Sequence, residues 1–348
     1  MGLGPVMLDL AGTELGPEER ELLLHPACGG VILFTRNYES PGQLLELVDS
    51  IHGLREPHLL VAVDHEGGRV QRFRHGFTHL PPAARIGAEW SHDRERGRSL
   101  ARTMGWLLAS ELRAVGVDFS FAPVLDLAHG VSGVIGDRAW HRSPRAVTEL
   151  AHQFMAGLQE AGMEAVGKHF PGHGGVREDS HLTLPVDERP LEELRAHDLV
   201  PFARMIEHGL AGIMPAHVVY RLVDDRPAGF SAYWLQGVLR RELGFKGAIF
   251  SDDLSMAAAD VGGSFADRAR LAIEAGCDMV LVCNHPEGAA EALDALADHD
   301  DPASRSRLAR MHGRGGLPLG ELRESPRWQE AVTRMAALAQ EPNLEMDV

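Results

Sequence analysis

The sequence predicts an α/β fold, a (β/α)8 TIM barrel in which eight parallel strands alternate with helices. Two observations predict it: eight short apolar runs rich in Val, Ile and Phe, and longer stretches of helical apolar spacing between them. Strict alternation of β and α units favours a closed parallel barrel over an open doubly wound sheet. An open sheet with a dinucleotide site also needs a glycine-rich turn after an early strand. None follows the first three runs in the right form.

The expected elements follow one another in a regular order. Strands are expected at residues 5–10, 30–34, 59–63, 118–122, 165–168, 212–214, 248–251 and 279–283. The clearest helices are expected at residues 43–51, 97–115, 146–161, 191–208 and 265–275. Ser40, Ser143 and Ser231 are expected to begin helices, because a serine side chain accepts a hydrogen bond from a free backbone N–H of the first turn.

Composition indicates a globular protein, long enough for one large barrel or two ordinary domains, and excludes several classes of protein. The chain has 348 residues, of which 44% are hydrophobic and 24% charged, which is typical of globular proteins. Residues 1–302 are expected to form the barrel, and residues 303–348 a C-terminal helical appendage packed on it. The net charge of −16 argues against nucleic acid as a partner, since such proteins carry a basic surface.

Location follows from what the sequence lacks. It contains no run of about 18 apolar residues, so no membrane-spanning helix is expected. The first residues lack the basic and apolar regions of a signal peptide, and the three cysteines have no disulfide-like spacing. The cytoplasm is therefore the expected location. A monomer is the expected oligomeric state, which these absences do not fix.

Polar side chains follow six of the expected strands. In a parallel barrel the carboxyl ends of the strands converge on one face, where barrel enzymes carry their catalytic groups. A single aspartate after a strand would indicate only a helix cap, but six such ends predict an active site. The polar groups are Asp64, Asp126, Lys168 with His169, His217, Asp252 with Asp253, and Asn284.

The densest polar group lies between residues 168 and 181, which hold three histidines, one lysine and two carboxylates on a glycine-rich loop. One interpretation is a metal-dependent hydrolase in which His169, His173, Asp179 and His181 bind zinc. The other is acid–base catalysis, in which Asp179 orients and charges His181. Positions i and i+2 of an extended segment share a face, which favours this pairing. His173 itself is expected to hydrogen-bond within the loop.

Adjacent carboxylates end the strand expected at residues 248–251. One of Asp252 and Asp253 suits a nucleophile and the other a cap, and the pattern does not tell which. Asp64 lies at another strand end and is followed by arginines, a combination suited to the hydroxyl groups of a sugar. Arg69 is expected to form a structural pair with an aspartate.

Together, three segments resemble the bacterial β-N-acetylglucosaminidases of glycoside hydrolase family 3. They are Lys-His-Phe-Pro-Gly-His-Gly with the later Asp-Ser-His (168–181), Val-Asp-His-Glu-Gly-Gly-Arg-Val-Gln-Arg (63–72), and Phe-Ser-Asp-Asp-Leu-Ser-Met (250–256). The chain is similar, from about residue 5 to residue 300, to the compact cytoplasmic type that recycles peptidoglycan.

The resemblance implies a retaining hydrolase that needs no metal and no cofactor. Its substrates would be peptidoglycan fragments, GlcNAc-1,6-anhydro-MurNAc and its peptides, from which it releases terminal β-linked GlcNAc. It implies Asp252 as nucleophile and His181 as acid/base with Asp179 behind it. Sugar binding is implied for Asp64, Arg72, Arg138, Lys168 and His169.

The chain departs from the family pattern at two places. His65 stands where the family more often has Gln, and Arg138-Ala139-Trp140 stands where it has Arg-Ser-Phe. Neither departure touches the implied catalytic groups. Both bear on the wall of the pocket beside the sugar.

Overall fold

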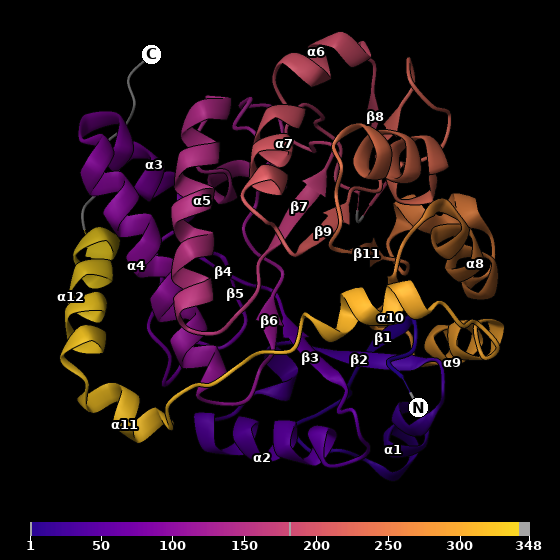
Figure 1. The fold of residues 1–348 in the computed structure, drawn as a ribbon, viewed down its shortest axis with the longest axis horizontal. Helices are drawn as coiled ribbons and strands as arrows, with labels where there is room; N and C mark the ends of the chain where they lie inside the picture. Colours follow the sequence, from indigo (N-terminus) through magenta and orange to yellow (C-terminus); the bar gives the residue numbers. More distant parts are fainter. Residues whose placement is uncertain (1, 181, 341–348) are drawn as a thin grey trace.

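The computed structural model describes residues 2–180 and 182–340, and within them eight parallel strands form one sheet (Figure 1). Each strand overlaps one of the eight expected runs, so the predicted strand positions are confirmed. The strands are β1 (Val6–Asp9), β2 (Cys28–Leu33), β3 (Leu60–Val63), β6 (Phe119–Ser120), β7 (Val166–Phe170), β9 (Gly212–Pro215), β11 (Ala248–Asp253) and β12 (Met279–Val282).

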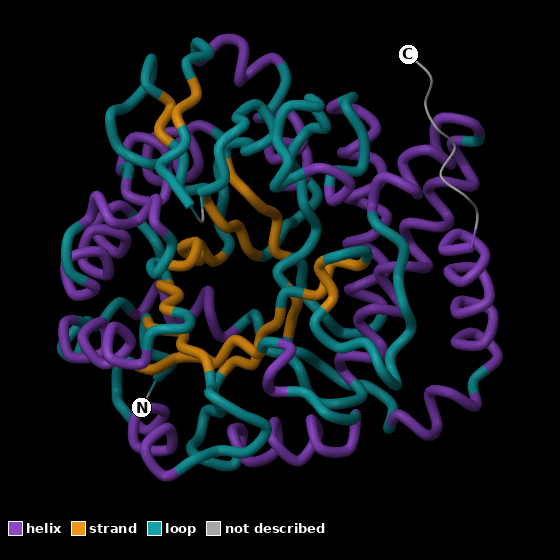
Figure 2. The backbone as a smooth tube through the Cα atoms, turned by 180° about the vertical axis from the view of Figure 1, so that it is seen from behind, coloured by secondary structure: helices purple, strands orange, loops and turns teal. Residues whose placement is uncertain are grey.

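The sheet closes into a barrel whose strands follow one another in chain order. The strand order is β6-β3-β2-β1-β12-β11-β9-β7, and every pairing within it is parallel. The two ends of this order are joined by hydrogen bonds from Val166 N to Ala122 O (2.8 Å) and from Leu125 N to Lys168 O (2.6 Å). The fold is therefore the predicted (β/α)8 barrel, with its strands forming the central ring in Figure 2.

Helices cover the outside of this ring (Figure 2). Their buried faces pack on the barrel, whose interior is filled by large apolar side chains such as Phe119, Phe121 and Phe250. The helices are α1 (Pro17–Leu24), α2 (Pro41–His52), α3 (Ala83–His92), α4 (Arg94–Arg113), α5 (Pro144–Glu160), α6 (Leu191–Ala196), α7 (Leu199–Glu207), η4 (Tyr233–Glu242), α8 (Phe265–Ala275) and α9 (Pro286–Ala295).

One predicted helix is wrong in its extent. The structure divides the run expected at residues 191–208 into α6 and α7, with a break at His197 and Asp198. The buried Asp198 carboxylate accepts a hydrogen bond from Arg189 Nη1 (2.8 Å) and lies 2.9 Å from His129 Nε2. These long-range partners draw the side chain inward at the break, and the apolar spacing carries no sign of them.

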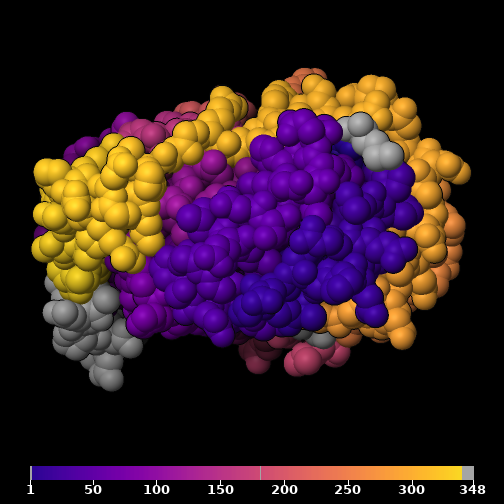
Figure 3. Space-filling view, turned by 90° about the horizontal axis from the view of Figure 1, so that it is seen from below, coloured from indigo at the N-terminus to yellow at the C-terminus, as the bar shows by residue number. Residues whose placement is uncertain are grey.

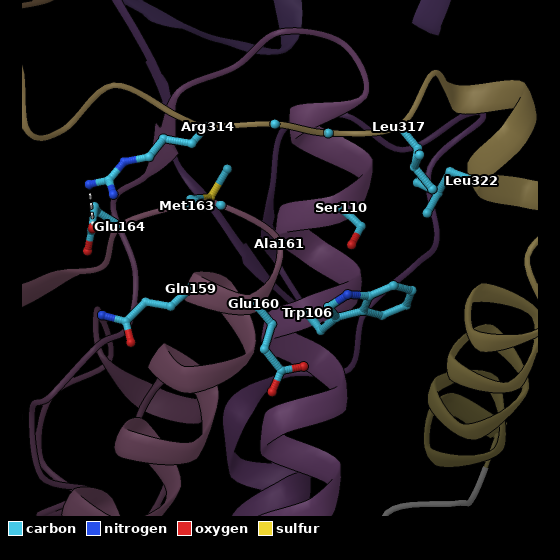
Figure 4. A pocket seen from close by; sticks show the side chains of 13 residues that line it. Trp106, Ser110, Gln159, Glu160, Ala161, Met163, Glu164, Arg314, Leu317 and Leu322 are labelled. Carbon is cyan, nitrogen blue, oxygen red and sulfur yellow. Dashed lines mark hydrogen bonds and ion pairs between the residues drawn. The ribbon is translucent and has the colours of Figure 1, made fainter.

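Beyond residue 302 the chain crosses the amino ends of the strands and then runs along α4. Arg307 of α10 (Pro302–Ala309) pairs with Asp278 at 2.6 Å, and Arg314 pairs with Glu164 at 3.4 Å. Figure 3 shows this segment as a yellow band. Its residues 314–317 line a hollow of about 660 Å³ together with Trp106, and Figure 4 shows the side chains of the lining. The chain then forms α11 (Leu319–Glu324) and α12 (Pro326–Gln340).

The division of the chain at residue 302 stays a prediction. No helix within the described ranges 2–180 and 182–340 has both the length and the apolar character needed to cross a bilayer.

Candidate active site

A cavity of about 460 Å³ opens at the carboxyl ends of the barrel strands. It gathers side chains that lie far apart in the sequence, as expected where parallel strand ends converge. The eighth predicted site residue, His181, lies outside the described residues. The other seven all line the cavity: Asp64, Arg72, Arg138, Lys168, His169, Asp179 and Asp252.

A chain of alternating charges runs along one side of the cavity. Lys168 Nζ lies 2.7 Å from Asp64 Oδ1 and 2.6 Å from Glu66 Oε1. Glu66 in turn accepts two hydrogen bonds from Arg138, at 2.8 and 2.9 Å. Burial alone would raise the pKa of Glu66, but the charges of Arg138 and Lys168 outweigh it and hold the pKa well below its usual range. Each ion in the chain therefore fixes its neighbours in position.

Glu66 was missed by the sequence analysis. It stands two residues after Asp64, and both side chains line the cavity. Alternate residues of an extended segment point to the same face, so this period-two spacing was the available signal.

Asp64 also faces a second cation. Arg72 Nη2 lies 3.7 Å from Asp64 Oδ2, on the side of the carboxylate away from Lys168. The Arg72 guanidinium lies over the Phe34 ring, 5.4 Å from its centroid. A fixed carboxylate beside a fixed guanidinium presents an acceptor and donors together, which suits adjacent hydroxyl groups of a sugar.

His169 is held by a carboxylate behind it. Its Nδ1 lies 2.7 Å from Asp126 Oδ2, and Asp126 is fully buried. Burial would raise the pKa of Asp126, but the His169 ring and the hydrogen bonds it receives lower it below the usual value. Because Nδ1 is engaged and the ring lines the cavity, Nε2 is the atom of His169 suited to contact a ligand.

The loop after β7 is anchored at two points beside Asp179. The His173 backbone N–H donates to Asp126 at 2.7 Å, and His173 Nε2 lies 3.2 Å from Ser180 Oγ. The Ser180 carbonyl accepts a hydrogen bond from Ala258 N, at 3.2 Å, in the segment after β11. The expectation that His173 hydrogen-bonds within its loop is confirmed. Asp179 directly precedes the anchored Ser180 and lines the cavity.

The two adjacent aspartates differ in their partners. The Asp253 carboxylate accepts hydrogen bonds from Ser255 N (2.9 Å), Ser255 Oγ (2.6 Å) and Cys283 N (3.0 Å). Burial raises the pKa of Asp253 to about 6, against the lowering effect of these bonds. Asp253 is thus held by the surrounding backbone and Ser255, while Asp252 lines the cavity beside it and accepts a hydrogen bond from Asp253 N at 2.9 Å. The role of Asp252 as nucleophile stays a prediction.

Two of the polar groups at strand ends lie behind the lining. Asp126 holds His169, as described, and the buried His217 lies with Nε2 3.2 Å from the Asp253 carbonyl oxygen. Neither residue is among those that line the cavity. They position lining residues instead of facing a ligand.

The metal interpretation finds little geometric support among the described residues. Over residues 2–180 and 182–340, the one group of at least three His, Cys, Asp or Glu ligand atoms within 4.8 Å of one another is elsewhere. It consists of His52, His58 and Asp118.

The remaining expectations concern residues near the cavity. Arg69 forms the expected structural pair, with Asp137, at 3.3 Å. His65 alternates away from the cavity and packs against Phe73 and Phe77, with ring centroids 5.8 and 5.9 Å apart. Trp140 is buried against Phe154 (5.5 Å), and neither it nor His65 lines the cavity. The two departures from the family pattern therefore change the packing behind the cavity and not its wall.

Comparison with known proteins identifies relatives over the full chain. Residues 7–310 match the family model described as the glycosyl hydrolase family 3 N-terminal domain. The chain is 67% identical to a beta-hexosaminidase of Thioalkalivibrio sulfidiphilus over 348 residues, which is all of both chains. It is 57% identical to a beta-hexosaminidase of Thiobacillus denitrificans, covering all of this chain and 97% of that one.

A solved structure is similar over nearly the whole fold. It is NagZ from Neisseria gonorrhoeae, in complex with N-trifluoroacetyl-D-glucosamine. The two chains are 48% identical and superpose with a TM-score of 0.93, covering 97% of this chain and 99% of that one.

Proposed function

The chain belongs to glycosyl hydrolase family 3, and we propose that this β-N-acetylhexosaminidase removes terminal β-linked GlcNAc from peptidoglycan fragments with retention of configuration. One observation carries the proposal. Asp252 and Asp179 line the same cavity as the charged chain of Asp64, Lys168 and Glu66, so reactive and binding groups face one ligand.

In the first proposed step, the GlcNAc ring lies against Asp64, Arg72 and Lys168. Their charged side chains form hydrogen bonds with its hydroxyl groups. A carboxylate oxygen of Asp252 attacks the anomeric carbon and forms a covalent bond to it. The bond between that carbon and the leaving oxygen breaks, and the oxygen takes a proton from His181.

In the second proposed step, water enters where the leaving group was. His181 takes a proton from the water as its oxygen attacks the anomeric carbon, and the bond to Asp252 breaks. The two inversions give net retention, and both side chains return to their starting protonation states.

Histidine as the acid has a physical rationale. The ordinary pKa of histidine lies near neutrality, whereas a carboxylic acid needs a strongly raised pKa to donate a proton at pH 7. Asp179, two residues before His181, would orient the imidazole and stabilise its charged form.

The proposal also covers the identity of the natural substrate, the location of the protein in the cell and its oligomeric state. We propose GlcNAc-1,6-anhydro-MurNAc and its peptides as substrates, met in the cytoplasm by a monomer. The support is the resemblance to the compact type that recycles peptidoglycan. Light scattering of the purified protein tests the monomer, and digestion of a purified muropeptide mixture tests the substrate.

The decisive experiment is mass spectrometry after incubation with a fluorinated, activated N-acetylglucosaminide, which slows the second step. We expect the protein to gain the mass of one glycosyl unit, on the peptide that contains Asp252. Turnover of the same sugar without an adduct, lost on chelation, would instead favour the metal-dependent alternative. The absence of both adduct and turnover would mean that the substrate is not a GlcNAc glycoside.

A further inference from the structure

A second group of polar side chains lies at the amino ends of the strands, away from the cavity. His52 is the last residue of α2, His58 lies just before β3, and Asp118 directly precedes β6. His52 Nε2 is 3.4 Å from Asp118 Oδ2, and His58 Nε2 is 4.0 Å from Asp118 Oδ1. The three ligand atoms lie within 4.8 Å of one another.

The two imidazoles face the Asp118 carboxylate as long ion pairs, at 3.4 and 4.0 Å. His52 Nε2 is buried, and among the described residues it has no hydrogen-bond partner. The His52 and His58 rings lie side by side, with centroids 4.3 Å apart. A buried polar atom without a partner is costly, which suggests that this nitrogen serves a ligand.

Asp118 is oriented by the backbone around it. Its Oδ2 accepts a hydrogen bond from Val61 N at 2.8 Å, and its Oδ1 accepts one from Gly313 N at 2.9 Å. Each carboxylate oxygen has two acceptor sites, so one on each oxygen remains. Backbone donors that fix a carboxylate in this way are typical of the groups behind a metal ligand.

Two side chains next to this group, Arg113 and His312, interact with backbone carbonyl groups instead of joining it. Arg113 Nη1 lies 3.6 Å from Asp118 Oδ1, but it donates to the carbonyl of Val117 at 2.8 Å. His312 lies against the His58 ring, with Nε2 3.0 Å from the His58 carbonyl and Nδ1 3.1 Å from that of Ala309. Both nitrogens of His312 therefore face acceptors, and it packs on the group without joining it.

We propose that His52, His58 and Asp118 bind one zinc ion, through the two Nε2 atoms and one carboxylate oxygen. Two imidazoles and a carboxylate with water in the fourth position form a familiar tetrahedral zinc set. Bonds of about 2.1 Å place tetrahedral ligand atoms roughly 3.4 Å apart. The present spacing needs only a small rotation of the half-exposed His58.

The ion would cross-link the elements that carry its ligands. It would join the end of α2 and the starts of β3 and β6, and through Asp118 also the backbone of Gly313. It lies at the opposite ends of the strands from the cavity, so zinc there is expected to change stability without changing glycoside hydrolysis.

The test is a titration of the chelator-treated, full-length protein with Zn²⁺ by calorimetry at pH 7.5. The variants are His52→Gln and His58→Gln, and the matched control is His152→Gln, because His152 lies outside the cluster and stacks on His208 (3.8 Å). We expect wild type and the control to bind one zinc ion whose affinity falls at least 100-fold in each cluster variant, as loss of a direct ligand should exceed the 10–100-fold typical of outer-shell changes. Zinc should also raise the melting temperature of the wild type and of the control, but not that of the two cluster variants.

Zinc bound with equal affinity and stoichiometry by all four proteins would overturn the proposal, because the ion would then lie elsewhere. Circular dichroism and hexosaminidase activity without zinc establish that each variant is folded. The outcome is independent of the proposed GlcNAc substrate, since binding and melting need no turnover.

Discussion

The two ends of the barrel use aspartate differently. At the carboxyl ends of the strands, Asp64 and Asp252 line an open cavity. At the amino ends, Asp118 and Asp278 are 1% and 2% exposed, and each accepts a hydrogen bond from the backbone of a neighbouring strand. For these four residues, the end of the strand at which the aspartate stands separates a side chain that faces the cavity from one that holds neighbouring strands together.

The largest expected effect separates the two adjacent aspartates. We expect Asp252→Asn to lower kcat/KM by about 10⁴- to 10⁶-fold, the range seen when single residues of a covalent catalytic group are removed, with stability nearly unchanged. Asp253→Asn should instead lower the free energy of unfolding by about 1–3 kcal/mol, because it disturbs bonds to Ser255 and Cys283. Steady-state kinetics and urea unfolding of both variants measure this. A large kinetic loss in folded Asp253→Asn with normal Asp252→Asn would reverse the assignment.

Asp278 tests the opposite end of the barrel. It pairs with Arg240 (2.8 Å) and Arg307 (2.6 Å) and accepts a hydrogen bond from Ile249 N (2.7 Å). Asp278→Ala leaves two arginines without their partner, so we expect a loss of about 3–5 kcal/mol in stability, as for other broken buried pairs. At a temperature where the variant is folded, kcat/KM per folded molecule should stay within about twofold of wild type. A selective kinetic loss would contradict the separation of the two ends.

Glu66 tests the charged chain in the cavity. Glu66→Gln removes the anion between Lys168 and Arg138, and we expect kcat/KM to fall about 10–100-fold, mainly through KM, given about 1.5–3 kcal/mol for each charged hydrogen bond. Asp137→Asn is the matched control, because its pair with Arg69 is half exposed and should matter little. Equal effects of the two changes would show that Glu66 acts only on the fold.

His65 gives the smallest effect, in the pH dependence of stability. Burial, with Arg72 and Arg74 nearby, lowers the pKa of His65 to about 3. Histidine has a pKa near 6.5 in the unfolded chain, and folding lowers that of His65. Its contribution to the free energy of unfolding is therefore fully present above pH 6.5 and is lost as the pH falls towards the pKa in the folded protein. Wild type should therefore lose about 2 kcal/mol relative to His65→Gln between pH 7 and pH 5. Parallel unfolding curves for the two proteins across this range would contradict the depressed pKa.

Most of the fold could be predicted from the sequence because the patterns that indicate strands and helices are local. Each barrel strand is a short apolar run, and the polar residue after it marks the carboxyl end, so the positions of Asp64, Lys168 and Asp252 followed directly. Local spacing failed where a distant partner decides the outcome. The break at Asp198 depends on Arg189 and His129, which the period of the helix does not reveal.

The same limit applies to the candidate site. Choosing between Asp252 and Asp253 requires the backbone of Cys283, thirty positions away, which donates to Asp253. The effect of the His65 departure required knowing that its ring turns towards Phe73 and Phe77. Glu66 could have been predicted, since it stands two residues after Asp64 and alternate residues of an extended segment point to the same face.

The pairing of β1 with β12 has a consequence for biosynthesis. Val6 pairs with Val280, 274 positions later, so the first strand made lies beside the last. While the ribosome is still synthesising the second half, the growing sheet has two unpaired edges, and such edges are templates for pairing with other chains. Contacts of such large sequence separation also fold slowly. The edge of β1 therefore stays without its β12 partner until almost the whole barrel has been made, and a chaperone that shields β1 during that time would prevent pairing with other chains.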